Sequence, residues 1–139
     1  MAEKIITKYV IDACALIAFL QNESGGDKLC ELFKVSENEF FMHSVNLTEV
    51  YYDAVYVAGE DKAQELFEKV AELPITILWD LNVPLIRLVG KYKTSYRISF
   101  ADAFVLALAE KEKAIVVSTD HHEFDVIESA GELSICWLR

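Results

Sequence analysis

Residues 98–124 read ISFADAFVLALAEKEKAIVVSTDHHEF, a stretch that predicts a helix, a buried strand and a second helix in succession. Ser99 is a favourable N-cap for the first helix, which we expect to continue to about Glu112. The apolar, β-branched run over 114–118 predicts the strand, and a short helix is expected over 121–128. This alternation of helix and strand is typical of a parallel sheet covered by helices on both faces.

Two acids in this stretch, Asp102 and Asp120, are expected at the same edge of the sheet. A helix that leads into a strand runs antiparallel to it, so the helix begins at the edge where the strand ends. Asp102 lies in the first turn of the expected helix, and Asp120 directly follows the strand. Ligand sites of open α/β sheets lie at this carboxyl edge. We therefore interpret both acids as candidate site residues.

The same alternation extends over the rest of the chain, with no repeat, low-complexity tract or linker. Ser44 is the expected N-cap of a helix that continues to Ala58. We expect a single domain over residues 1–139 with a mainly parallel sheet of five strands. The other expected strands are 8–12, 40–43, 75–78 and 133–137, and the other expected helices are 13–21, 27–35, 61–73 and 82–93.

Asp12 and Glu49 occupy comparable positions, Asp12 at the end of a strand and Glu49 near the start of a helix. Carboxylates that converge on one place repel each other unless a cation lies between them. Mg²⁺ and Mn²⁺ prefer oxygen ligands and often bind a few carboxylates together with water. The pattern therefore predicts a divalent metal site formed by Asp12, Glu49, Asp102 and Asp120.

Helix capping is the structural alternative for each acid. Asp12 could cap its helix, and three pairs have the spacing of a capping box: Asn46 with Glu49, Ser99 with Asp102, and Asp120 with Glu123. Apolar surroundings favour the metal site. Asp102 is the only charge from residue 99 to residue 109, and an unpaired carboxylate in a buried helix is costly unless it binds something.

The charge balance argues against broad electrostatic binding to nucleic acid. The 139 residues carry a formal net charge of −10, with 53% hydrophobic and 26% charged residues, as in a globular protein. The one local basic patch comprises Lys91, Lys93 and Arg97, which we interpret as candidate RNA contacts, with a solvated helix end as the alternative. Tyr92 or Tyr96 could stack on a base beside them.

Three cysteines and three histidines form no recognisable zinc pattern. The cysteines Cys14, Cys30 and Cys136 are odd in number and form no C-x-x-C pair, so we expect reduced, buried thiols and a cytoplasmic protein. No apolar run reaches the roughly 18 residues that a membrane span needs, and the early apolar run resembles no signal peptide.

At these residues the chain resembles the PIN-domain family of metal-dependent ribonucleases, and particularly the small VapC-type toxins of toxin–antitoxin pairs. The resemblance covers nearly the whole chain: a strand ending in Asp12, the Glu49 helix, and the strings ISFADA and STDHHEF. It implies a three-layer α/β/α sandwich with a central, mainly parallel five-stranded sheet. It also implies Mg²⁺- or Mn²⁺-dependent hydrolysis of RNA phosphodiester bonds, dimerisation and neutralisation by an antitoxin.

Carried onto this sequence, the resemblance assigns catalysis and metal binding to Asp12, Glu49, Asp102 and Asp120. It assigns supporting roles to Ser99, Thr119 and Glu123, although Glu123 equally fits a capping box. The chain departs from the family at Ala13-Cys14, where Thr or Ser and then a small polar residue are common. The departure removes a hydroxyl group from the expected metal site.

Other functions remain open from the sequence: an RNA-processing nuclease without an antitoxin, or a non-catalytic acidic binding module. Two phosphotransferase patterns fit less well. Haloacid-dehalogenase-like enzymes need a second Asp where this chain has Cys14. Response-regulator receivers need neighbouring acids at the first strand end, and this chain has only Asp12 there, although Asp80 follows the third strand.

Overall fold

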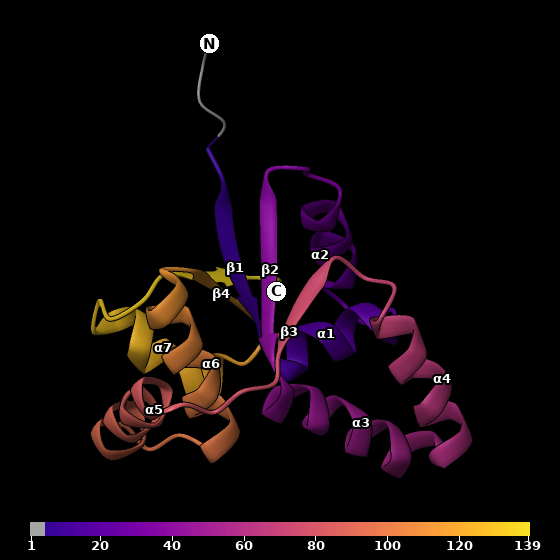
Figure 1. The fold of residues 1–139 in the computed structure, drawn as a ribbon. Helices are drawn as coiled ribbons and strands as arrows, with labels where there is room; N and C mark the ends of the chain where they lie inside the picture. Colours follow the sequence, from indigo (N-terminus) through magenta and orange to yellow (C-terminus); the bar gives the residue numbers. More distant parts are fainter. Residues whose placement is uncertain (1–4) are drawn as a thin grey trace.

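The computed structural model describes residues 5–139, and one parallel sheet of five strands forms its centre (Figure 1). The strand order is β3-β2-β1-β4-β5, and all four neighbouring pairs are parallel. This confirms the expected α/β class and five-stranded sheet. The strands are β1 (Thr7–Ile11), β2 (Asn38–His43), β3 (Ile75–Leu78), β4 (Ile115–Ser118) and β5 (Ile135–Trp137).

Helices connect the strands and cover both faces of the sheet, as Figure 1 shows. Within residues 5–139 they are α1 (Ala13–Leu20), α2 (Gly26–Phe33), α3 (Ser44–Ala58), α4 (Glu60–Val70), α5 (Val83–Ser95), α6 (Phe100–Glu112) and α7 (His121–Ser129).

Alternating side chains of the central strands supply two separate cores. Val10 of β1 and Val116 of β4 pack with side chains of α5, α6 and α7. The next residues, Ile11 and Val117, pack with side chains of α1, α2 and α3 on the other face. Successive residues of a strand point to opposite faces, so two adjacent apolar residues serve both cores. The result is the three-layer α/β/α arrangement.

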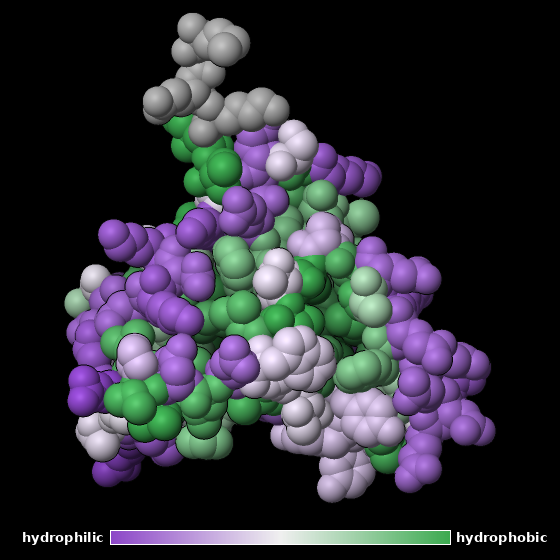
Figure 2. Space-filling view, in the orientation of Figure 1, coloured by the Kyte–Doolittle hydropathy of each residue, from purple (hydrophilic) through white to green (hydrophobic). Residues whose placement is uncertain are grey.

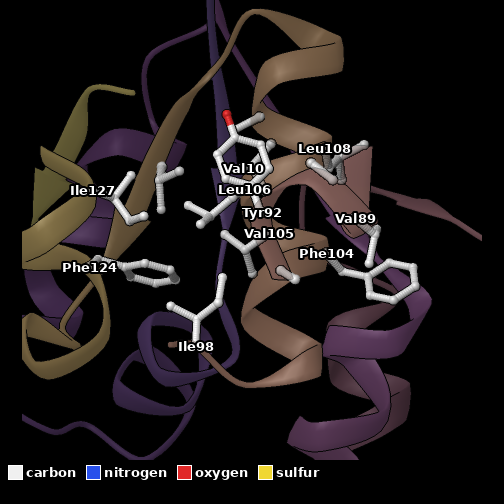
Figure 3. Packing of buried hydrophobic residues seen from close by; sticks show 14 of the residues in the cluster. Val10, Val89, Tyr92, Ile98, Phe104, Val105, Leu106, Leu108, Phe124 and Ile127 are labelled. Atoms are coloured by element: carbon white, nitrogen blue, oxygen red, sulfur yellow. The ribbon is translucent and has the colours of Figure 1, made fainter. Parts of the chain in front are cut away.

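Helix α6 is the most deeply buried helix, because every residue from Ala103 to Ala109 is buried. Figure 3 shows Val105 and Leu106 of α6 in one cluster with Phe124 and Ile127 of α7. The first turn of α6 carries Asp102, so this packing fixes the position of that acid.

Several local expectations need correction. His43, and not Ser44, is the N-cap of α3: its Nδ1 accepts from Val45 N at 3.1 Å while its Nε2 contacts the Asp80 carbonyl oxygen at 2.9 Å. Helix α4 ends at Val70, before the expected residue 73, because the chain turns toward β3. Cys14 is exposed, and Cys30 and Cys136 are only partly buried, so the expectation of buried thiols was wrong.

None of the helices within residues 5–139 is long and apolar enough to cross a membrane.

Candidate active site

The four predicted acids lie at the carboxyl edge of the sheet. Asp12 and Asp120 directly follow the neighbouring parallel strands β1 and β4, and each is the N-cap of the next helix. Glu49 lies on α3 and Asp102 in the first turn of α6, and these two helices pack against each other. Topology therefore brings together acids that are separated by more than a hundred residues in the sequence.

Asp12 is the most buried of the acids, with an exposed fraction of 2%. Its Oδ1 accepts a hydrogen bond from Ala15 N at 2.7 Å, and its Oδ2 accepts one from the Ser118 hydroxyl. The pKa of Asp12 is raised to about 7, mainly by burial and also by the charges of Asp102 and Asp120, whereas the two hydrogen bonds lower it. The capping alternative is therefore confirmed for Asp12, and its assignment to a metal site stays a prediction.

Asp102 is partly buried, and its position depends on the cap of α6. The Ser99 hydroxyl accepts from Asp102 N at 3.1 Å, which confirms Ser99 as the N-cap. Burial raises the pKa of the Asp102 carboxyl to about 7, and the nearby charges of Glu123, Asp120 and Glu49 contribute to this rise. The negative charges of the other acids therefore act directly on the Asp102 carboxyl.

Glu49 completes the cluster from α3. Burial raises its pKa, and the charge of Asp120 adds to the rise, whereas hydrogen bonding by Asn46 and Tyr52 opposes it. A surface groove with a volume of about 400 Å³ adjoins Glu49, and its walls include Tyr52 and Phe100. Glu49 thus links the buried acids to a solvent-accessible part of the surface.

The Cys14 thiol also lies near all four acids. Its pKa is raised to about 12, mainly by desolvation and also by the carboxylates of Asp12, Asp120, Asp102 and Glu49. The charges of all four acids therefore act on this one sulfur atom, which occupies a position where the family commonly has a hydroxyl group. The raised pKa keeps this thiol protonated and unreactive at neutral pH.

These residues fit a divalent cation by their chemistry. The donor set consists of hard carboxylate oxygens, and burial together with the neighbouring carboxylates raises the pKa values of Asp12 and Asp102, so a bound cation would favour their ionised forms. The side-chain oxygen of Asn46 is buried and has no hydrogen-bond partner among residues 5–139. In the described part of the chain, no group of three or more His, Cys, Asp or Glu side chains is arranged to hold a metal ion.

Ser118, which the sequence analysis did not select, supports the site. It is fully buried, its hydroxyl donates to Asp12 Oδ2, and its Oγ accepts from Asp120 N at 2.9 Å. The sequence pointed to the next residue, Thr119, which is partly exposed. The available signal was the position of Ser118 at the end of a strand that is buried on both faces of the sheet.

Replacing Ser118 with Ala is expected to weaken metal binding about 10- to 100-fold, as losses of supporting hydrogen bonds around metal ligands commonly do. The variant leaves Asp12 Oδ2 and Asp120 N without their shared partner. Calorimetric Mn²⁺ titration checks this, with Thr119→Ala as the neighbouring control. Equal effects of the two substitutions would contradict the assignment of support to Ser118.

For Glu123, only half of the capping box forms, because Asp120 N donates to Ser118 Oγ, and a supporting role of Glu123 in the site stays a prediction. Its backbone N donates to Asp120 Oδ1 at 3.2 Å, and its charge raises the pKa of Asp102. It therefore belongs to the first turn of α7 and lies near the acidic cluster.

The three residues of the basic patch, Lys91, Lys93 and Arg97, have different surroundings. The Lys91 ammonium lies 2.6 Å from Glu110 Oε1 and 3.9 Å from Glu132 Oε2. Glu110 lies eight residues beyond Asp102 on α6, roughly 12 Å along the helix axis, so Lys91 lies away from the acids. Lys93 donates to the Ile98 carbonyl at 2.8 Å, close to the start of α6, and Arg97 is exposed.

Tyr92 is a core residue and not a surface for base stacking. Its exposed fraction is 0%, and its hydroxyl donates to Glu110 Oε1 at 2.8 Å. The expectation that Tyr92 could stack on a base was therefore wrong. Tyr96, which stacks on Tyr92, is partly buried.

A family model described as the PIN domain matches residues 9–129, which include all four acids. The chain belongs to the PIN-domain family. PIN domains are typically nucleases and are generally metal-dependent. No curated protein matches the chain in sequence.

Solved structures of VapBC proteins and of a VapC toxin share this fold. VapBC2 from Rickettsia felis, bound to a DNA fragment of its promoter, has a TM-score of 0.74 and 17% identity over 94% of this chain and 98% of that chain. DNA-bound VapBC from Salmonella typhimurium has a TM-score of 0.72 and 15% identity, covering 96% and 100%. VapC20 from Mycobacterium tuberculosis, described as a Sarcin–Ricin loop cleaving toxin, has a TM-score of 0.68 and 12% identity, covering 88% and 95%.

Proposed function

We propose that this PIN domain is a Mg²⁺- or Mn²⁺-dependent endoribonuclease that hydrolyses RNA phosphodiester bonds and acts as the toxin of a toxin–antitoxin pair. The observation that carries the proposal is the convergence of four carboxylates, two of which have pKa values raised to about 7 by burial and by their neighbours. Such a cluster disfavours an anionic substrate unless bound cations offset its charge.

Asp12, Asp102 and Asp120 would hold the metal, with Glu49 as a direct or water-mediated ligand. A bound divalent ion supplies Lewis acidity toward the phosphate and an activated water for its hydrolysis. Ser118 holds Asp12 and Asp120 together, Ser99 holds the first turn that carries Asp102, and Glu123 adds negative charge beside Asp102. Thr119 stays a proposed supporting residue.

An antitoxin is the proposed protein partner, and we expect both proteins to act in the cytoplasm. Similar folds were crystallised as toxin–antitoxin complexes, and a net charge of −10 suits a basic partner. A neighbouring gene for a small basic or DNA-binding protein would support this part. Without such a gene, an RNA-processing nuclease of the same chemistry becomes the better proposal.

A homodimer is also part of the proposal. Figure 2 shows hydrophobic residues and residues of intermediate hydropathy across the centre of one face, with hydrophilic residues on both sides. Trp79, Val83 and Ile86 are 66%, 58% and 51% exposed, which is typical of an interaction surface. Ile86→Glu is expected to convert a dimer to a monomer in sedimentation velocity experiments. A wild-type protein that sediments as a monomer at all concentrations would contradict the dimer.

The basic residues make separable contributions to RNA binding. Lys93→Ala and Arg97→Ala are each expected to weaken binding and to reduce the salt slope by about one. Lys91→Ala is the matched control, because the Lys91 ammonium pairs with Glu110 and lies away from the acids. Fluorescence anisotropy with a labelled RNA at several salt concentrations checks this. Equal losses in all three variants would contradict the distinction.

Cleavage of total RNA with Mn²⁺, with Mg²⁺ and with excess EDTA tests the proposed activity. We expect discrete fragments with either metal and none with EDTA. A folded protein that binds metal but cleaves no RNA would refute the nuclease proposal and favour a non-catalytic binding module.

A further inference from the structure

Among residues 5–139, four polar or charged residues are buried: Asp12, His43, Asn46 and Ser118. Asp12 and Ser118 belong to the acidic site, and His43 caps α3 and contacts the Asp80 carbonyl. Asn46, which is 1% exposed, is not a cap, because His43 holds that position. We propose that Asn46 is a positioning residue that fixes Glu49 relative to Asp102, an inference that rests on the proposed metal site.

The Asn46 side chain connects the two helices that carry these acids. Its Nδ2 donates to the Ala101 carbonyl oxygen at 2.9 Å, and Ala101 directly precedes Asp102 in α6. Glu49 lies one turn further along α3, and the neighbouring Asn46 amide opposes the rise of the Glu49 pKa. The amide therefore ties the turn of α3 that precedes Glu49 to the first turn of α6, which carries Asp102.

The orientation of this amide is determined by its partners. Rotating it by half a turn would place Oδ1 against the Ala101 carbonyl oxygen, and two acceptors repel each other. In the observed orientation Oδ1 is buried, and no donor within residues 5–139 reaches it. A buried unpaired acceptor is unfavourable for stability, so an apolar residue of the same size would serve packing better. The amide is therefore explained by the site and not by the core.

Asn46→Leu separates positioning from packing. Leu has a similar volume and removes the unpaired oxygen, so we expect the variant to remain as stable as the wild type in urea. Because the variant loses the hydrogen bond that ties α3 to the start of α6, we expect Mn²⁺ to bind about 10- to 100-fold more weakly. Asn46→Ala, measured in the same way, also removes the amide and so controls for an effect of poor packing by the Leu side chain.

Asn38→Leu is the matched control. The Asn38 Nδ2 also donates to a backbone carbonyl, that of Leu32 at 3.0 Å, but it lies at the start of β2, the opposite end of the sheet. Mn²⁺ affinity is measured calorimetrically for all variants at one pH. An unchanged affinity in both Asn46 variants, with Mn²⁺ binding intact in the wild type, overturns the positioning role alone.

The same experiment distinguishes this inference from the proposed function. A wild type that binds Mn²⁺ without cleaving RNA refutes the nuclease, while the affinities of the Asn46 variants still decide the positioning role. A wild type that binds no Mn²⁺ refutes both. In a cleaving wild type, we expect saturating Mn²⁺ to restore most of the kcat of Asn46→Leu, because the acids themselves are present.

Discussion

Asp102→Asn is expected to lower metal-dependent RNA cleavage about a thousandfold while the protein remains folded. Removing a carboxylate ligand forfeits charge stabilisation of several kcal/mol at a catalytic metal, and each 1.36 kcal/mol is a factor of ten in rate. Asn has nearly the same shape, and Ser99 still caps the helix through the backbone N of residue 102. Initial cleavage rates with saturating Mn²⁺ give the measurement.

The matched control for this loss is Asp61→Asn. Asp61, like Asp102, lies in the first turn of a helix, so both substitutions remove the same favourable interaction with the helix dipole. Asp61 is exposed on α4 and is absent from the residues that shift the pKa values of the acidic cluster. Comparable loss of activity in the two variants would contradict a catalytic role for Asp102.

The second large effect is a loss of metal-free stability as pH rises. The pKa of Asp12 is raised from 3.8 to about 7 in the folded protein, so the folded state binds more protons than the unfolded state between these values. The free energy of unfolding therefore falls as pH increases from about 4 to 7. For a fully buried group this pKa difference corresponds to roughly 4 kcal/mol, as an upper magnitude. Asp102 acts in the same direction.

Urea unfolding at pH 5 and pH 8, with EDTA or with Mn²⁺, checks this prediction. We expect the wild type to be less stable at pH 8 in EDTA and to recover with Mn²⁺, which favours the ionised carboxylates. Asp12→Asn cannot ionise at this position, and its amide oxygen can still accept from Ala15 N. Its stability should therefore depend less on pH and respond little to Mn²⁺. Identical pH profiles for the two proteins would contradict the raised pKa.

The sequence allowed the fold and the acidic cluster to be predicted because both depend on local signals. Alternating apolar strands and helices define a parallel sheet, and each acid lies either directly after a strand or in the first two turns of a helix. Parallel topology then places all four at one edge. For this reason the positions of Asp12, Asp102 and Asp120 at this edge could be predicted without knowledge of any tertiary contact.

Features that depend on tertiary contacts could not be predicted from the sequence. Lys91 looked like a free cation, but its partner Glu110 lies 19 residues away and is brought close only by the packing of α5 on α6. Cys14 was expected to be a core thiol, but it lies on the exposed face of α1. The Asn46 contact with Ala101 spans 55 residues and two helices, so its spacing from Glu49 suggested only a cap.

Calorimetric titration of Mn²⁺ into the metal-free wild type and into Asp12→Asn at pH 7.5 tests the central claim most directly. The four carboxylates are predicted to bind Mn²⁺ saturably in the wild type, with proton release from Asp12 and Asp102, whose pKa values lie near 7. Asp12→Asn is predicted to lose most of this binding. Equal binding by both proteins, or none by the wild type, would contradict a metal site at this edge of the sheet.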